Sequence, residues 1–156
     1  MSSARFWDGS RQADTFIFRN DYDRFDLVKA GNGWDIIADG KNDGYWSSDK
    51  FFGQAGNDTL ISNDGDDMLF GNMGADTFIV HANWYDPAEV QFPWQPVQDH
   101  DVVGFNVDVF GGKGEDTLIV KHSDGYTLEH HGNATIIHTA FGGTITARGI
   151  EDFEFL

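Results

Sequence analysis

The sequence predicts an all-β protein: a parallel β-roll, which is a flattened, β-helix-like solenoid, followed by a C-terminal antiparallel β cap. Three observations predict this fold. Residues 44–79 repeat every nine residues, four times and without a gap. The first six places of the blocks are rich in Gly, Asn and Asp, which form turns, and a short apolar strand follows. Residues 120–156 instead alternate apolar and polar residues between turn signals.

The four blocks share two fixed places. The blocks are GYWSSDKFF (44–52), GQAGNDTLI (53–61), SNDGDDMLF (62–70) and GNMGADTFI (71–79). Each has Asp at its sixth place (Asp49, Asp58, Asp67, Asp76) and a large apolar residue at its eighth (Phe51, Leu60, Leu69, Phe78). A fifth block, GGKGEDTLI (111–119), fits the same pattern, and weaker copies cover 9–17, 21–29, 30–38 and 96–104. A fixed period of this length is typical of a solenoid.

Nine residues make a structural unit because the strand in each block is too short to stand alone. Side chains alternate along a strand, so the eighth-place residue points inward while its neighbours point outward. Two blocks then form one full coil, with one strand in each of two parallel sheets. We expect Leu60 and Phe78 to stack in one sheet and to face Phe51 and Leu69 from the other.

The turns predict a metal site. Blocks two apart meet at the same edge, which pairs Asp58 with Asp35 and Asp76 on one edge, and Asp49 with Asp26 and Asp67 on the other. Stacked carboxylates repel each other unless a cation lies between them. Carboxylates and turn carbonyls together suit a hard cation with six to eight oxygen ligands, which is Ca²⁺, whereas Mg²⁺ requires tighter octahedral geometry. Glycine is needed where a Cβ would block the approach of the backbone.

These blocks resemble the RTX (repeats-in-toxin) family of type I-secreted bacterial proteins. The resemblance implies a right-handed parallel β-roll with Ca²⁺ between its turns. From oxygen-rich cages of this kind we expect about three to five ions. The resemblance also implies folding only after export into a calcium-rich medium. The ligands that it implies are sixth-place carboxylates and carbonyls of the Gly-rich places: Gly31, Gly33, Asp35, Asp49, Gly53, Gly56, Asp58, Gly65, Asp67, Gly71, Gly74, Asp76, Gly114 and Asp116. Gln12, Arg24 and Ser47 stand in the fourth place of three blocks instead of Gly.

The composition agrees with a calcium-dependent protein. Asp and Glu number 26 against 10 Lys and Arg, a formal net charge of −16. Such self-repulsion destabilises a compact metal-free state. Nucleic acid is an unfavourable partner because binding it needs a basic patch. The chain has no cysteine and no apolar run long enough to span a membrane. The first ten residues, MSSARFWDGS, lack the apolar stretch of a signal peptide, so we do not expect an N-terminal export signal in them. The family implies a C-terminal, uncleaved export signal instead.

We divide the chain into the β-roll, 1–119, and the cap with a candidate secretion signal, 120–156. Residues 80–98 interrupt the roll and hold all three prolines together with several aromatic residues. Two interpretations stay open: the aromatic residues cover the end of the roll, or they bind a protein or polysaccharide through Trp84, Tyr85 and Trp94. In the cap we expect antiparallel strands at 126–130, 134–139, 144–148 and 152–156. The final segment, EDFEFL, resembles the tail of type I secretion substrates.

The sequence does not indicate an enzyme, since it contains no H-E-x-x-H, no G-x-S-x-G and no cysteine nucleophile. We therefore expect a secreted, calcium-binding structural or binding module that also serves export of a type I-secreted bacterial protein. Two alternatives stay open. One is a small stand-alone structural protein of a cell surface or phage virion, which the initial Met1 favours. The other is a carbohydrate-binding module that uses the 80–98 insertion.

Overall fold

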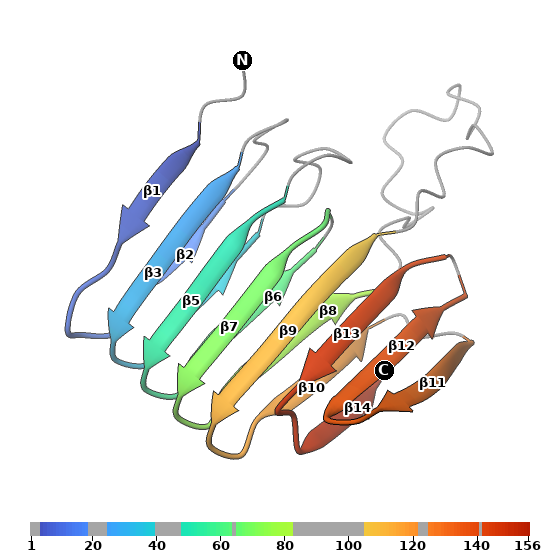
Figure 1. The fold of residues 1–156 in the computed structure, drawn as a ribbon. Coiled ribbons are helices and arrows are strands. Elements are labelled where there is room, and N and C mark those ends of the chain that lie inside the picture. Colours follow the sequence, from blue (N-terminus) through green and yellow to red (C-terminus); the bar gives the residue numbers. More distant parts are fainter. Residues whose placement is uncertain are drawn as a thin grey trace, which may run out of the picture.

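The computed structural model describes residues 4–18, 25–39, 48–63, 65–82, 105–121, 125–140 and 142–156. These residues form β-strands and no helix, and the strands make two sheets that lie face to face (Figure 1). The eight-stranded sheet has the order β1 (Arg5–Asp8), β3 (Asp26–Asn32), β5 (Lys50–Ala55), β7 (Met68–Met73), β9 (Asn106–Lys113), β13 (Thr144–Arg148), β12 (Ala134–Thr139) and β11 (Tyr126–His131). The six-stranded sheet has the order β14 (Asp152–Phe155), β10 (Thr117–Lys121), β8 (Thr77–His81), β6 (Thr59–Ser62), β4 (Ile36–Ala38) and β2 (Thr15–Ile17).

From β1 to β10, successive strands alternate between the two sheets, and each strand pairs in parallel with the strand two places along the chain. This is the predicted all-β parallel β-roll. Strands of the eight-stranded sheet are longer than the three residues that each block predicts, because their pairing continues into the first three places of the next block. In β5, for example, pairing with β7 continues to Ala55 opposite Met73.

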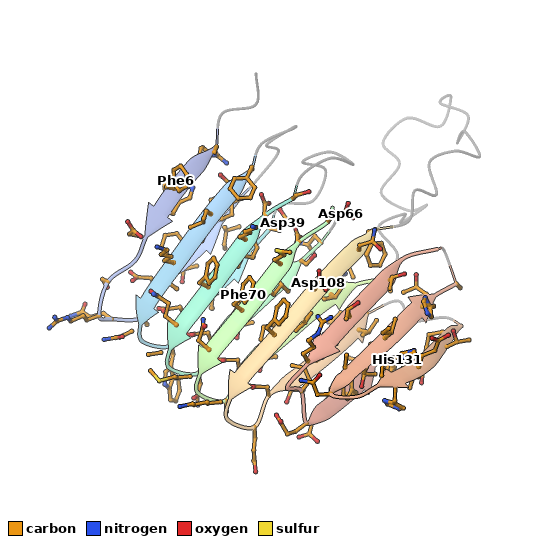
Figure 2. The ribbon with its side chains drawn as sticks, in the orientation of Figure 1. Phe6, Asp39, Asp66, Phe70, Asp108 and His131 are labelled. Carbon is orange, nitrogen blue, oxygen red and sulfur yellow. The ribbon has the colours of Figure 1, made fainter. Side chains whose placement is uncertain are left out.

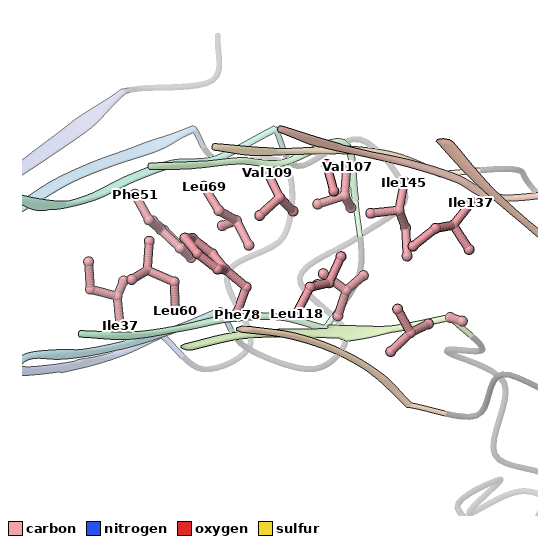
Figure 3. Packing of buried hydrophobic residues seen from close by; sticks show 14 of the residues in the cluster. Ile37, Phe51, Leu60, Leu69, Phe78, Val107, Val109, Leu118, Ile137 and Ile145 are labelled. Carbon is pink, nitrogen blue, oxygen red and sulfur yellow. The ribbon is translucent and has the colours of Figure 1, made fainter. Parts of the chain in front are cut away.

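The eighth-place residues form the core, as predicted. Leu60 lies opposite Phe78 in the six-stranded sheet, and Phe51 lies opposite Leu69 in the other. All four side chains are fully buried. Figure 3 shows them meeting between the two sheets. The core therefore consists of two facing columns of apolar side chains, extended by residues such as Leu118.

The outer face of the eight-stranded sheet carries a ladder of stacked phenylalanines. Phe52 and Phe70 lie with ring centroids 4.6 Å apart, Phe70 and Phe110 4.7 Å apart, and both pairs are within 4° of parallel. The Arg148 guanidinium lies 5.3 Å from the centroid of Phe110. Figure 2 shows Phe70 on this face. The rings stack face to face between neighbouring strands, and this packing stabilises the register of the strands.

The C-terminal strands follow the predicted antiparallel arrangement in part. β11 and β12 pair antiparallel, and so do β12 and β13, as expected. However, β13 pairs in parallel with β9, and β14 pairs in parallel with β10. The strands at 144–148 and 152–155 therefore add one more coil to the roll. Alternation of apolar and polar residues predicts strands but not their direction, which explains the error.

The connection between β8 and β9 lies mostly outside the described residues, and so do Trp84, Tyr85 and Trp94. Residues 96–104, which the sequence assigned to a weak block, also lie outside the described residues. In β9, Val109 lies opposite Leu69 at the eighth place, which puts Val107 at the sixth place. No helix with the length and hydrophobicity of a membrane span occurs in the described part of the chain.

Candidate calcium sites between the turns

The roll has two edges with different turns. At the first edge, the chain passes from the eight-stranded to the six-stranded sheet. The turns of this edge are residues 33–35, 56–58, 74–76 and 114–116. Each of these turns is a Gly-x-Asp sequence. We call the second edge the one where the chain returns, and it contains Asp26, Asp49 and Asp67. The two edges thus hold the two sets of stacked carboxylates that the nine-residue period predicts.

The carboxylates of the first edge form a ladder. The backbone N–H of Asp35 donates to Asp58 Oδ1 at 2.9 Å, that of Asp58 donates to Asp76 Oδ1 at 2.9 Å, and that of Asp76 donates to Asp116 Oδ1 at 2.8 Å. Asp14 and Glu151 continue the ladder at its two ends, because the N–H of Asp14 donates to Asp35 and that of Asp116 donates to Glu151 Oε2. One oxygen of each Asp is therefore fixed by the preceding turn.

The second oxygen of these carboxylates has no hydrogen-bond partner. Oδ2 is buried and unsatisfied in each of Asp35, Asp58, Asp76 and Asp116. Leaving one buried polar group unsatisfied costs about 1–3 kcal/mol, and more for a charged group. Four such groups are expensive against a typical domain stability of about 5–15 kcal/mol. The ladder therefore lacks a group, such as a cation, that these four oxygens can contact.

Glycines leave room for these carboxylate oxygens and for the close approach of successive turns. A Cβ on Gly53, Gly71 or Gly111, the first-place residues, would collide with Oδ2 of Asp58, Asp76 or Asp116 of the same turn. A Cβ on the fourth-place Gly56 or Gly74 would collide with the carbonyl oxygen of Gly33 or Gly56 in the preceding turn. These fourth-place glycines also have φ of +136° and +133°, which other residues rarely adopt. Carboxylate oxygens and close-packed backbone carbonyls therefore lie along one edge.

The electrostatics of the ladder favour a bound cation. Burial raises the pKa of Asp76 to about 6; the hydrogen bond from the Asp58 N–H opposes this shift, and the charges of Asp58 and Asp116 add to it. Burial is also the main cause that raises the pKa values of Asp35, Asp58 and Asp116. Ionising these carboxylates is therefore unfavourable in the metal-free site, and a bound cation would offset that cost.

The oxygen chemistry fits Ca²⁺. Among the described residues there is no group of three or more His, Asp or Glu side chains that could hold a metal. Backbone carbonyls must therefore supply most ligands beside each carboxylate. Six to eight oxygen ligands in an adaptable cage are what Ca²⁺ takes, whereas a transition metal prefers nitrogen or sulfur.

Comparison with known families agrees with this geometry. Residues 43–78 match the family model of the RTX calcium-binding nonapeptide repeat, in four copies. These residues are RTX calcium-binding repeats. No match to the chain was found among curated proteins. Within residues 43–78, the RTX repeat accounts for the parallel strands and the acidic turns, and it is a structural, calcium-binding repeat.

The structure separates the residues that the sequence implicated as ligands. The first edge brings together most of them: Gly31, Gly33, Asp35, Gly53, Gly56, Asp58, Gly71, Gly74, Asp76, Gly114 and Asp116. Asp49, Gly65 and Asp67 lie on the second edge. There the Asp26 N–H donates to Asp49 Oδ1 at 2.7 Å and the Asp49 N–H donates to Asp67 Oδ1 at 2.9 Å, so the ladder exists on this edge too.

Two carboxylates of the second-edge ladder, those of Asp26 and Asp67, have protein partners for both oxygens or for the second oxygen. Asp26 accepts two hydrogen bonds from the Arg5 guanidinium, and Asp67 Oδ2 accepts one from the Ser62 hydroxyl at 2.7 Å. Asp14, at the start of the first edge, is also satisfied, since its Oδ2 accepts the Ser10 N–H. These carboxylates are weaker candidates for metal ligands than the four with an unsatisfied oxygen.

Sequence reasoning missed Glu151 and Gly111. Gly111 occupies the first place of a recognised block, so its role in leaving room for Asp116 follows from the pattern. Glu151 occupies the position that corresponds to Asp116 in the preceding coil, and Arg148 pairs with Phe110. The chain takes six residues from Phe110 to Asp116 but only three from Arg148 to Glu151. A nine-residue template cannot find a turn that is shortened in this way.

Proposed function

We propose that this protein is an RTX β-roll that folds on binding Ca²⁺, with one ion in each gap of the first edge beside Asp35, Asp58, Asp76 and Asp116. The single observation that carries this proposal is the column of four buried Oδ2 atoms without a partner. Ligands from successive turns would share each ion, so binding would join the coils. Metal-binding energy is then folding energy.

We further propose that the chain is a structural module of a type I-secreted bacterial protein and acts outside the cell. A formal charge of −16 and raised carboxylate pKa values oppose folding when calcium is scarce, as it is in cytosol. The segment 151–156, which resembles an export signal, is largely β14 and pairs with β10. Such a signal would be accessible only before folding, so calcium outside the cell would complete export by folding the chain. We assign no catalytic role to it.

The experiment is a calcium titration of the full chain after treatment with EDTA, followed by far-ultraviolet circular dichroism. We expect little β signal without metal and a cooperative gain in millimolar Ca²⁺, with much less in equal Mg²⁺. A chain that keeps its full β signal and its melting temperature in EDTA would overturn the proposal. Export is tested separately, by replacing the EDFEFL segment in cells that carry a type I exporter and measuring the protein in the medium.

A further inference from the structure

Arg5 occupies an unexpected position in the second-edge ladder. The register pairs Arg5 of β1 with Asp26 of β3, and Asp26 is followed along this edge by Asp49 and Asp67. Arg5 therefore stands at the sixth-place position, where the next three coils have an aspartate. The first coil places a cation at the end of a stack of carboxylates.

The contact between Arg5 and Asp26 is close and bidentate. Nε donates to Oδ1 at 2.8 Å and Nη2 donates to Oδ2 at 2.6 Å. The Asp26 side chain is only 3% exposed, so this ion pair is shielded from solvent. A planar guanidinium satisfies both oxygens of a carboxylate at once. On the first edge, the equivalent second oxygen has no protein partner.

The guanidinium is held in place by aromatic rings. Its central carbon lies 5.8 Å from the ring of Trp7 and 5.8 Å from that of Phe18, and the two ring centroids are themselves 5.8 Å apart. Phe18 in turn stacks on the core residue Phe51. Arg5 therefore joins the end of the apolar core to the end of the carboxylate ladder.

The other end of this ladder is satisfied by a hydroxyl. Ser62 takes the first place of its block, where the first edge has Gly53, Gly71 and Gly111. Its Oγ donates to Asp67 Oδ2 at 2.7 Å, and both side chains are buried. The oxygen that faces a glycine on the first edge faces a hydrogen-bond donor here.

We propose that Arg5 is an internal cation that replaces a calcium ion at the N-terminal end of the second ladder, and that neither Asp26 nor Asp67 holds a metal. This rests on the proposed function, because it assumes that the unsatisfied carboxylates of the first edge do bind calcium. The two edges then have different tasks: the first requires Ca²⁺, and the ends of the second are stabilised by the chain itself.

The test counts the Ca²⁺ ions bound to the full chain by native mass spectrometry. Asp67→Asn should bind as many ions as the wild type, whereas Asp58→Asn should bind one fewer. Arg5→Gln should bind one more ion, because Asp26 is released. Arg148→Gln removes the same charge and a similar ring contact on the outer face, and should leave the count unchanged.

The outcomes separate the two proposals. A loss of one ion in Asp67→Asn, or an unchanged count in a folded Arg5→Gln chain, would overturn the inference about the second edge. If Arg5→Gln does not fold, the Asp67→Asn count still decides it. A wild type that binds no Ca²⁺, or an Asp58→Asn chain that loses none, would overturn the proposed function instead.

Discussion

Replacing Asp76 by Asn should change stability in opposite directions with and without calcium. Burial raises the pKa of Asp76 from 3.8 to about 6 in the metal-free folded chain. The stabilising contribution of the protonated group is present below pH 3.8 and is lost as the pH rises through about 6. At pH 7 the ionised group thus costs roughly 3 kcal/mol, since one pKa unit is 1.36 kcal/mol. Asn carries no charge and can still accept the Asp58 N–H, so the metal-free variant should be more stable.

With calcium bound, the sign should reverse, because Asn lacks the charged ligand. An ion at a hundred times its dissociation constant contributes about 2.7 kcal/mol to stability, which the variant would lose. Folding promoted by trimethylamine oxide in EDTA, and unfolding by urea in saturating Ca²⁺, measure the two states. Asp66→Asn removes an exposed charge on the second edge and is the matched control. If Asp76→Asn shifts both midpoints in the same direction, the ladder is not a calcium site.

Three further predictions concern the turns, the pH and the core. Gly56→Ala should raise the Ca²⁺ concentration for half-folding at least about tenfold, because its Cβ meets the Gly33 carbonyl and φ is +136°. Gly132→Ala, with φ of +62° but nothing within 4 Å of its Cβ, should raise that concentration much less, as circular dichroism would show. Lowering the pH from about 7 to about 5 should weaken Ca²⁺ binding in calorimetry, because protons compete for Asp76; an affinity that does not change would contradict this. Phe51→Ala should lower the free energy of unfolding in Ca²⁺ by about 3–5 kcal/mol. Phe52→Ala, on the outer face, should cost less, and equal losses would refute the assignment of faces.

The repeat predicts much of the roll because its period fixes geometry. Leu60 and Phe78 must face inward if the eighth place does, and Asp58 must meet Asp35 and Asp76 if two blocks make a coil. The last coil could not be predicted, since the turn before Glu151 is shortened and alternation does not set the direction of β13 and β14. The difference between the edges also depends on single residues. Arg5 precedes the recognisable blocks, so the repeat does not assign it a position. Ser62 replaces Gly at the first place of its block, and the repeat pattern alone does not show that its hydroxyl contacts Asp67.

The central claim is tested most directly by anomalous diffraction from crystals of the calcium-bound chain. We predict anomalous peaks about 2.3–2.6 Å from Oδ2 of Asp58, Asp76 and Asp116, with backbone carbonyl oxygens completing each shell. A well-ordered crystal in millimolar Ca²⁺ that shows no peak along the first edge would contradict the account.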